Sequence, residues 1–162
     1  MWCRSSTQRL FFIAIVIFSA IGAACDVIGK QPFMMVQVCV NNSNGVSLFK
    51  SIMNDMARSE EMDFVDQSEA VQLGLNEMRD NTGRYLREGT VYILVRGRLE
   101  FGLIATNFGL RKYQIAIGFS EGNAPSEARL FAQRAVFSLG KHWPVEILPN
   151  GKGAFPMETC GS

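Results

Sequence analysis

A serine between two glycines is the strongest catalytic pattern in this chain. Residues 118–122 read GFSEG, which matches the G-x-S-x-G sequence that places a serine nucleophile on a sharp turn between a strand and a helix. Such a serine also needs a base and an acid that orients the base. The single histidine, His142, follows the serine, and Glu127 lies between them. The residue types of a serine hydrolase that uses Ser120 are therefore present.

The sequence around this motif argues against catalysis. Pro125 follows Ser120 closely, where it would break the helix that the motif needs. The 162-residue chain also ends too soon after Ser120 to supply the rest of a hydrolase sheet. We therefore expect a glycine-flanked loop and no catalytic residue, and we keep the hydrolase as a remote alternative.

His142 is also the only histidine available to bind a metal. No cysteine or histidine stands near it at the spacing of a metal site, so we expect no metal ion and no cofactor. It directly follows the end of an expected helix, where a cationic side chain is favourable for the helix dipole. A structural role therefore suits His142 better than a catalytic one.

The chain begins with the features of an export signal. Residues 10–25 read LFFIAIVIFSAIGAAC, an apolar run that follows Arg4 and Arg9 and stops at Cys25. A basic start, an apolar middle and small residues at the end are typical of a secretory signal. The run is shorter than the about 20 residues that cross a bilayer as a helix. We therefore predict a signal peptide over residues 1–24.

The end of this run resembles the lipobox of bacterial lipoproteins. It reads Ile21-Gly22-Ala23-Ala24-Cys25, with glycine where that family prefers leucine. The resemblance implies that the Cys25 sulfur is acylated, that the preceding peptide is removed, and that the new amino terminus is acylated too. Several acyl chains would hold the protein firmly on the periplasmic side of the cell envelope, and Asp26 favours the inner membrane. Plain secretion after cleavage at Ala24 and an uncleaved anchor are the alternatives.

For the chain that follows the signal peptide, we predict a tether over residues 25–33 and a single domain over 34–162. The whole chain has 16 Lys and Arg against 15 Asp and Glu. Because Arg4 and Arg9 leave with the signal, the mature chain is close to neutral. Nucleic-acid binding needs a strongly basic surface, so we expect no nucleic-acid partner.

The four cysteines support export. Cys3 leaves with the signal, and lipidation of Cys25 would leave Cys39 and Cys160 as an even pair in an oxidising compartment. We predict a disulfide between them, which would tie the carboxyl-terminal tail to the first strand of the domain. By loop-closure entropy this bond would contribute about 4 kcal/mol. Two free thiols are the alternative.

Hydrophobic periodicity predicts the elements that position these residues. Alternating or β-prone stretches predict six strands, at residues 34–40, 63–67, 90–96, 98–106, 113–119 and 145–148. Apolar residues at helical spacing predict three helices, ending near residue 59, over 68–79 and over 125–139. The expected fold is α+β, with the order β-α-β-α-β-β-β-α-β. We expect a mixed β-sheet with right-handed crossovers and helices mainly on one face, similar to ferredoxin-like folds with additions.

Charges are separated along the chain. Residues 55–78 carry seven acids against one base, and residues 79–112 carry seven bases against three acids. Such a distribution can steer or dock a charged partner. We expect Arg96 and Arg98, on adjacent strands, to be the contact residues for a protein partner. Two solvated faces that compensate each other are the alternative.

Residues 113–160 resemble small proteobacterial lipoproteins of unknown function. The resemblance implies an envelope location and a structured tail that ends in a cysteine, and it implies no catalytic residue. The leading hypothesis is a non-enzymatic envelope lipoprotein that binds a protein, for example an inhibitor or immunity protein against an envelope-acting toxin. The alternative is an accessory lipoprotein of envelope assembly that binds lipid or peptidoglycan.

Overall fold

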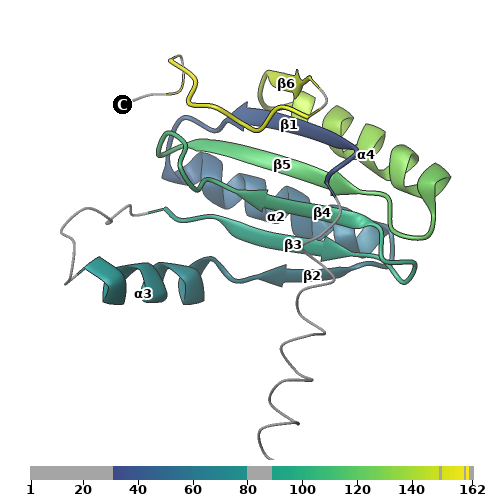
Figure 1. The fold of residues 1–162 in the computed structure, drawn as a ribbon, viewed down its shortest axis with the longest axis horizontal. Helices are drawn as coiled ribbons and strands as arrows, with labels where there is room; N and C mark the ends of the chain where they lie inside the picture. The colour runs from purple at the N-terminus through teal and green to yellow at the C-terminus, as the bar shows by residue number, and fades with distance from the viewer. Residues whose placement is uncertain (1–30, 80–88, 150, 159, 161–162) are drawn as a thin grey trace, which may run out of the picture. The chain divides into compact units, whose positions relative to one another are not determined.

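Six strands and three helices form the described part of the chain (Figure 1). The structure is a computed structural model that describes residues 31–79, 89–149, 151–158 and 160. The expected signal peptide and Cys25 therefore lie outside the described residues. The elements are β1 (Met34–Cys39), α2 (Ser43–Ser59), β2 (Asp63–Asp66), α3 (Ser68–Arg79), β3 (Tyr92–Arg96), β4 (Gly102–Thr106), β5 (Gln114–Ser120), α4 (Pro125–Gly140) and β6 (Val145–Leu148).

The strands form one sheet in the order β2-β3-β4-β5-β1-β6. The α+β class and the predicted succession of elements are confirmed. Every neighbouring pair is antiparallel, so the sheet is antiparallel rather than mixed. Strands β1 and β2, which α2 joins, run in the same direction but do not pair. The meander β3–β4–β5 lies between them and pairs with both.

Helices α2 and α4 cover one face of the sheet, as predicted (Figure 1). Alternate residues of each strand point toward them, which is the two-residue period of a pleated strand. The buried strand residues on this face include Val36, Val38, Ile93, Val95, Leu103, Ala105, Ile115, Ile117 and Phe119. They pack against apolar side chains from the two helices, chiefly Phe49, Met53, Phe131, Ala135 and Leu139. The core therefore lies between the sheet and this pair of helices.

Local signals fix where the helices begin. The Asn42 side chain accepts a hydrogen bond from the backbone N–H of Gly45 at 2.8 Å, which satisfies a free donor at the start of α2. Pro125 stands in the first turn of α4, where its missing N–H is harmless. Pro125 therefore begins a helix, as its position in the sequence predicts.

One predicted strand is too long at its start. The sequence predicts a strand from residue 98, but β4 begins at Gly102. Residues 97–101 form a turn instead, in which the Gly97 N–H donates to the Phe101 carbonyl at 2.9 Å and Glu100 has φ 62°. Leu99 lies in this turn and is 49% exposed. The other predicted boundaries agree with the structure to within two residues.

Candidate functional site

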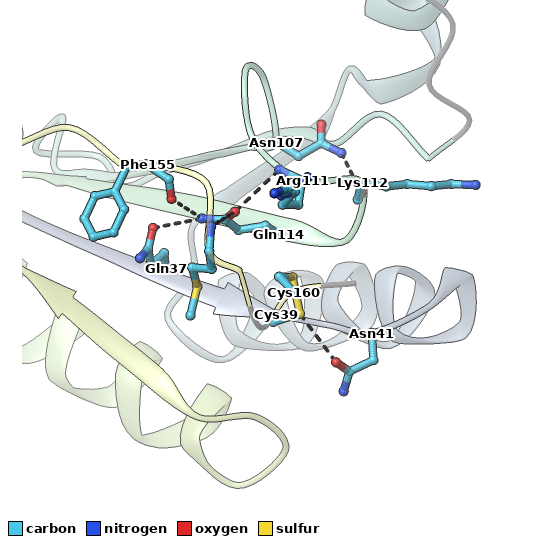
Figure 2. The surroundings of a disulfide bond; sticks show 10 residues. Gln37, Cys39, Asn41, Asn107, Arg111, Lys112, Gln114, Phe155 and Cys160 are labelled. Carbon is cyan, nitrogen blue, oxygen red and sulfur yellow. Dashed lines mark hydrogen bonds between the residues drawn. A yellow bond between two sulfur atoms is a disulfide. The ribbon is translucent and has the colours of Figure 1, made fainter. Parts of the chain in front are cut away.

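A disulfide fastens the carboxyl-terminal tail to β1 (Figure 2). The sulfur atoms of Cys39 and Cys160 lie 2.09 Å apart and their Cα atoms 5.3 Å apart, so the predicted pair is present. Cys160 is fully buried. The Cys39 sulfur also lies 3.4 Å from Asn41 Oδ1. Because an oxidised sulfur carries no proton, that approach is a contact and not a hydrogen bond.

Two fully buried glutamines hold the same tail to the sheet (Figure 2). Gln114 Nε2 donates to Gln37 Oε1 at 3.0 Å and to the Phe155 carbonyl at 2.7 Å. Gln114 Oε1 accepts from the backbone N–H of Met157 at 2.9 Å. Gln37 Nε2 donates in turn to Glu146 on β6 at 2.7 Å. The tail therefore covers part of β5 and β1, on the face of the sheet away from the helices.

Strands β2, β3 and β4 present an apolar row on this same face. The strand register places Val65 opposite Leu94, and Leu94 opposite Ile104. These residues alternate with the buried ones that point toward the helices. Val65 is 44% exposed and Ile104 is 39% exposed. We call the side chains of Val65, Tyr92, Leu94, Arg96 and Ile104 the open face.

The two ends of the open face differ in chemistry. At one end the Tyr92 ring packs against the ring of Phe108, with 6.0 Å between their centroids, and Phe108 is 42% exposed. At the other end Arg96 stands opposite Asp63 of β2. Aromatic and aliphatic side chains with arginine at the margin are typical of protein-binding surfaces.

Arg96 and Arg98 lie at the same end of β3, as expected for a shared contact. Arg96 closes the strand and Arg98 follows in the turn, so Arg98 is not on an adjacent strand as the sequence predicts. Both side chains are exposed. Within the described residues, neither guanidinium forms a hydrogen bond or an ion pair.

The loop between β5 and α4 packs against the turn that carries Arg98. The Asn123 backbone N–H donates to the Leu99 carbonyl at 2.8 Å. Gly122 has φ 53°, and a Cβ atom there would lie 2.5 Å from the Leu99 carbonyl oxygen. Only glycine permits this conformation and this approach without strain. The last glycine of G-x-S-x-G is thus explained by packing rather than by catalysis.

The structure does not bring Ser120 and His142 together. Ser120 ends β5, and its hydroxyl donates to the Gly102 carbonyl at 3.4 Å. His142 follows α4, whose 16 residues span about 24 Å. The His142 ring lies 5.5 Å from the Trp143 ring. The serine therefore has no histidine base, and this geometry does not form a hydrolase triad.

Part of the acidic stretch is neutralised inside the domain. The Lys50 ammonium lies 2.9 Å from an Asp66 carboxylate oxygen, and the Arg134 guanidinium lies 2.6 Å from a Glu60 carboxylate oxygen. The expected separation of charge is therefore reduced on the acidic side. Within the part of the chain that the structure describes, Arg96 and Arg98 make no ion pair, so they are the more distinctive part of the charge pattern.

Asp66 also helps to position β3, the middle strand of the open face. Its carboxylate accepts hydrogen bonds from the backbone N–H and the hydroxyl of Ser68. The Ser68 hydroxyl accepts in turn from the Tyr92 N–H of β3 at 3.0 Å. Burial raises the pKa of Asp66, but the hydrogen bonds from Ser68 and Lys50 and the lysine charge lower it more. The net pKa lies below the ordinary value, so Asp66 is ionised at neutral pH.

The density of basic residues indicates Arg96 and Arg98 in the sequence, whereas no sequence signal indicates the buried glutamine pair or the pair of Tyr92 and Phe108. The burial of Gln37 depends on the tail, which is distant in sequence and packs over it through Gln114. Within the described ranges, no three His, Cys, Asp or Glu side chains gather as a metal site. Among the helices described, none has the length and apolar character needed to cross a membrane.

Comparison with models of protein families, with curated proteins and with solved structures finds no match to this chain.

Proposed function

We propose that this chain is a non-enzymatic lipoprotein of the bacterial cell envelope that binds a protein partner through its open face. The observation that carries the proposal is the apolar row of Val65, Leu94 and Ile104 beside two exposed arginines. A sheet normally buries its apolar side chains against another layer. Among the described residues, the tail supplies that layer over only part of the sheet, and a partner would supply the rest.

The cysteines support the proposed location. A disulfide persists in an oxidising compartment such as the periplasm, and Cys39 and Cys160 lie at disulfide distance. The resemblance of residues 21–25 to a lipobox supports an anchor at Cys25. Export and the disulfide agree with each other, because a cytoplasmic protein would keep both thiols reduced.

The edges of the sheet are less suited to a partner than its open face. Edge strand β2 has four residues and carries Asp63 and Asp66. Edge strand β6 also has four residues and lies between Pro144 and Pro149. Short strands, charges and prolines are the means by which proteins prevent pairing at sheet edges. Binding by strand addition is therefore disfavoured at both edges.

Inhibition of an envelope-acting toxin or hydrolase is the concrete form of this binding that we favour. An inhibitor needs a rigid surface that retains its shape, because ordering a flexible one would reduce affinity. The disulfide, the buried glutamines and the glycine-packed turn all fix the elements that surround the open face.

Two measurements test the proposal. Mass spectrometry of the mature protein from membranes should show an acylated chain that begins at Cys25 and contains the Cys39–Cys160 bond. An unmodified or uncleaved amino terminus would contradict the anchor. Affinity purification of the full-length chain from detergent-solubilised envelope should recover one protein reproducibly. Repeated recovery of no partner would contradict binding.

A further inference from the structure

The chain enters the domain at the end of the sheet that carries the turn between β3 and β4. The Phe33 backbone N–H donates to the Phe119 carbonyl at 2.9 Å, so the chain is already fixed beside the end of β5 before β1 begins. Strand β4 starts at the same level, because Gly102 stands opposite Ser120. The start of β1 and the turn between β3 and β4 both lie at the right in Figure 1.

The number of residues before this entry point limits how far the domain can lie from a lipid anchor. Cys25 stands seven residues before Pro32. Seven residues span at most about 25 Å, whatever their conformation. Strand β5 alone spans about 23 Å with its seven residues. The opposite end of the sheet would therefore reach the membrane only if the tether ran fully extended along the whole domain, and the end with the turn is the nearer one.

The turn at this end presents an exposed leucine on a fixed backbone. Leu99 is 49% exposed. Its carbonyl accepts a hydrogen bond from the Asn123 N–H at 2.8 Å, and the Gly97 N–H donates to the Phe101 carbonyl at 2.9 Å. Because the backbone is already ordered, inserting the side chain into a lipid surface costs little conformational entropy. An apolar side chain also gains free energy when it leaves water for the boundary of the acyl chains.

The charges around Leu99 do not select a charged surface. Arg98 precedes it and Glu100 follows it, and both side chains are exposed. Arg96 stands opposite Asp63 in the strand register. The long side chain of Arg98 can keep its guanidinium at the level of the headgroups while Leu99 lies deeper. Contact with lipid at this end therefore depends on the apolar side chain and not on anionic headgroups.

We infer that the domain stands on the membrane that holds its anchor, with the turn between β3 and β4 against the lipid and Leu99 inserted among the headgroups. This inference rests on the proposed function, because it requires the anchor at Cys25, and it adds the lipid surface that the domain contacts. The strands then run away from the membrane. The open face stands to the side, where a partner can reach it.

Spin labelling of the acylated protein tests this orientation. With Cys25 acylated and Cys39 bonded to Cys160, one introduced cysteine is the only free thiol of the mature chain. The mature protein is purified from membranes and placed in phosphatidylcholine vesicles, with the label at Arg98→Cys. The matched control is Arg111→Cys, which removes the same charge from an exposed position before β5, at the opposite end of the sheet.

Relaxation of the label by oxygen, which concentrates in lipid, is compared with relaxation by a nickel chelate, which stays in water. We expect the oxygen-to-nickel ratio to be several-fold higher at position 98 than at position 111. Because the contact does not depend on lipid charge, the ratio at position 98 should be unchanged when phosphatidylglycerol is added to the vesicles.

Removal of the leucine tests its insertion. Leu99→Ser, in the protein labelled at position 98, should raise the accessibility of the label to nickel about threefold. Leu130→Ser is the control, because Leu130 is a leucine of similar exposure, 53%, on α4. It should leave the accessibility unchanged. Equal melting temperatures of the two variants show that both are folded.

The outcomes separate the inference from the proposed function. If the acylated protein is bound to vesicles and the ratio at position 98 is no higher than at position 111, the inference is overturned and the anchor stands. Equal effects of Leu99→Ser and Leu130→Ser, or a high ratio only with phosphatidylglycerol, also overturn it. If the mature protein carries no acyl chain on Cys25 and does not bind the vesicles, the inference and the proposed lipoprotein both fail.

Discussion

The Gln114 side chain donates a hydrogen bond to the Gln37 side chain across β5 and β1, with 3.0 Å between Nε2 and Oε1. Both glutamines are fully buried, and Gln114 also binds backbone groups of the tail at Phe155 and Met157. This pair lies on the face of the sheet away from the helices, where the tail packs over it. A buried amide stabilises a fold only when its partners are in place, so the pair makes the position of the tail specific.

Replacing Gln114 with an apolar residue should destabilise the protein, because its hydrogen-bond partners would remain buried. Gln114→Leu leaves the Gln37 amide oxygen and two backbone groups of the tail without these partners in a buried site. We expect a loss of about 1–3 kcal/mol in the free energy of unfolding, measured by urea denaturation. Gln133→Leu, at an exposed position on α4, is the matched control. Similar losses in the two variants would contradict the role of the buried pair.

The disulfide should account for a large part of the stability. Cys39 and Cys160 close a loop over a sequence separation of 121 residues. We expect Cys160→Ser to lower the free energy of unfolding by about 4 kcal/mol. A reductant should lower the melting temperature of the wild type and leave that of Cys39→Ser/Cys160→Ser unchanged. A wild type that is insensitive to reductant after full reduction would contradict this prediction.

The fold was largely predictable because its signals are local. Alternation of Val36 and Val38 on β1 and the helical spacing of Phe49 and Met53 on α2 each match the face that the structure buries. The pairing of strands was not predictable in this way. A β1–α2–β2 sequence favours a parallel pair, but the meander that follows pairs between β1 and β2. Only contacts distant in sequence determine that choice.

The turn between β3 and β4 should tolerate no side chain at Gly122, in the loop that packs against it. Gly122→Ala would force a Cβ atom against the Leu99 carbonyl in a left-handed conformation. We expect a loss of about 1–3 kcal/mol in the free energy of unfolding. Gly140→Ala is the control, because nothing lies within 4 Å of a Cβ atom there. A Gly122→Ala variant as stable as Gly140→Ala would show that the loop does not hold the turn.

The stability at low pH should depend on Asp66. Burial raises its pKa, but the Ser68 and Lys50 hydrogen bonds lower it below the ordinary value of 3.8. A carboxyl with a lowered pKa in the folded state stabilises the fold above its unfolded pKa. That contribution is lost as the pH falls through the folded value. We therefore expect the melting temperature of the wild type to fall more than that of Asp66→Asn below about pH 4, as measured by circular dichroism. Parallel curves would contradict the assignment.

The candidate site was only partly predictable. The density of basic residues indicated Arg96 and Arg98, because charge is visible in sequence. The apolar row was not visible, since Val65, Leu94 and Ile104 belong to three strands and only the register brings them together. The exposure of a sheet face also depends on which other segments of the chain pack over it. Sequence periodicity does not show how far the tail extends over a sheet.

The central claim is that a partner binds through the open face. Recovery of the partner with variants at Ile104 and at a control position tests this claim most directly. Ile104→Asp places a charge in the apolar row, and Leu48→Asp places the same charge on α2, where Leu48 is 42% exposed. Ile104→Thr keeps the β-branched shape, so it is a second variant at this position that should remain folded. The partner recovered from solubilised envelope should be retained by Leu48→Asp and lost or strongly reduced with both Ile104 variants, at unchanged melting temperatures. Equal recovery with all three variants would contradict binding through the open face.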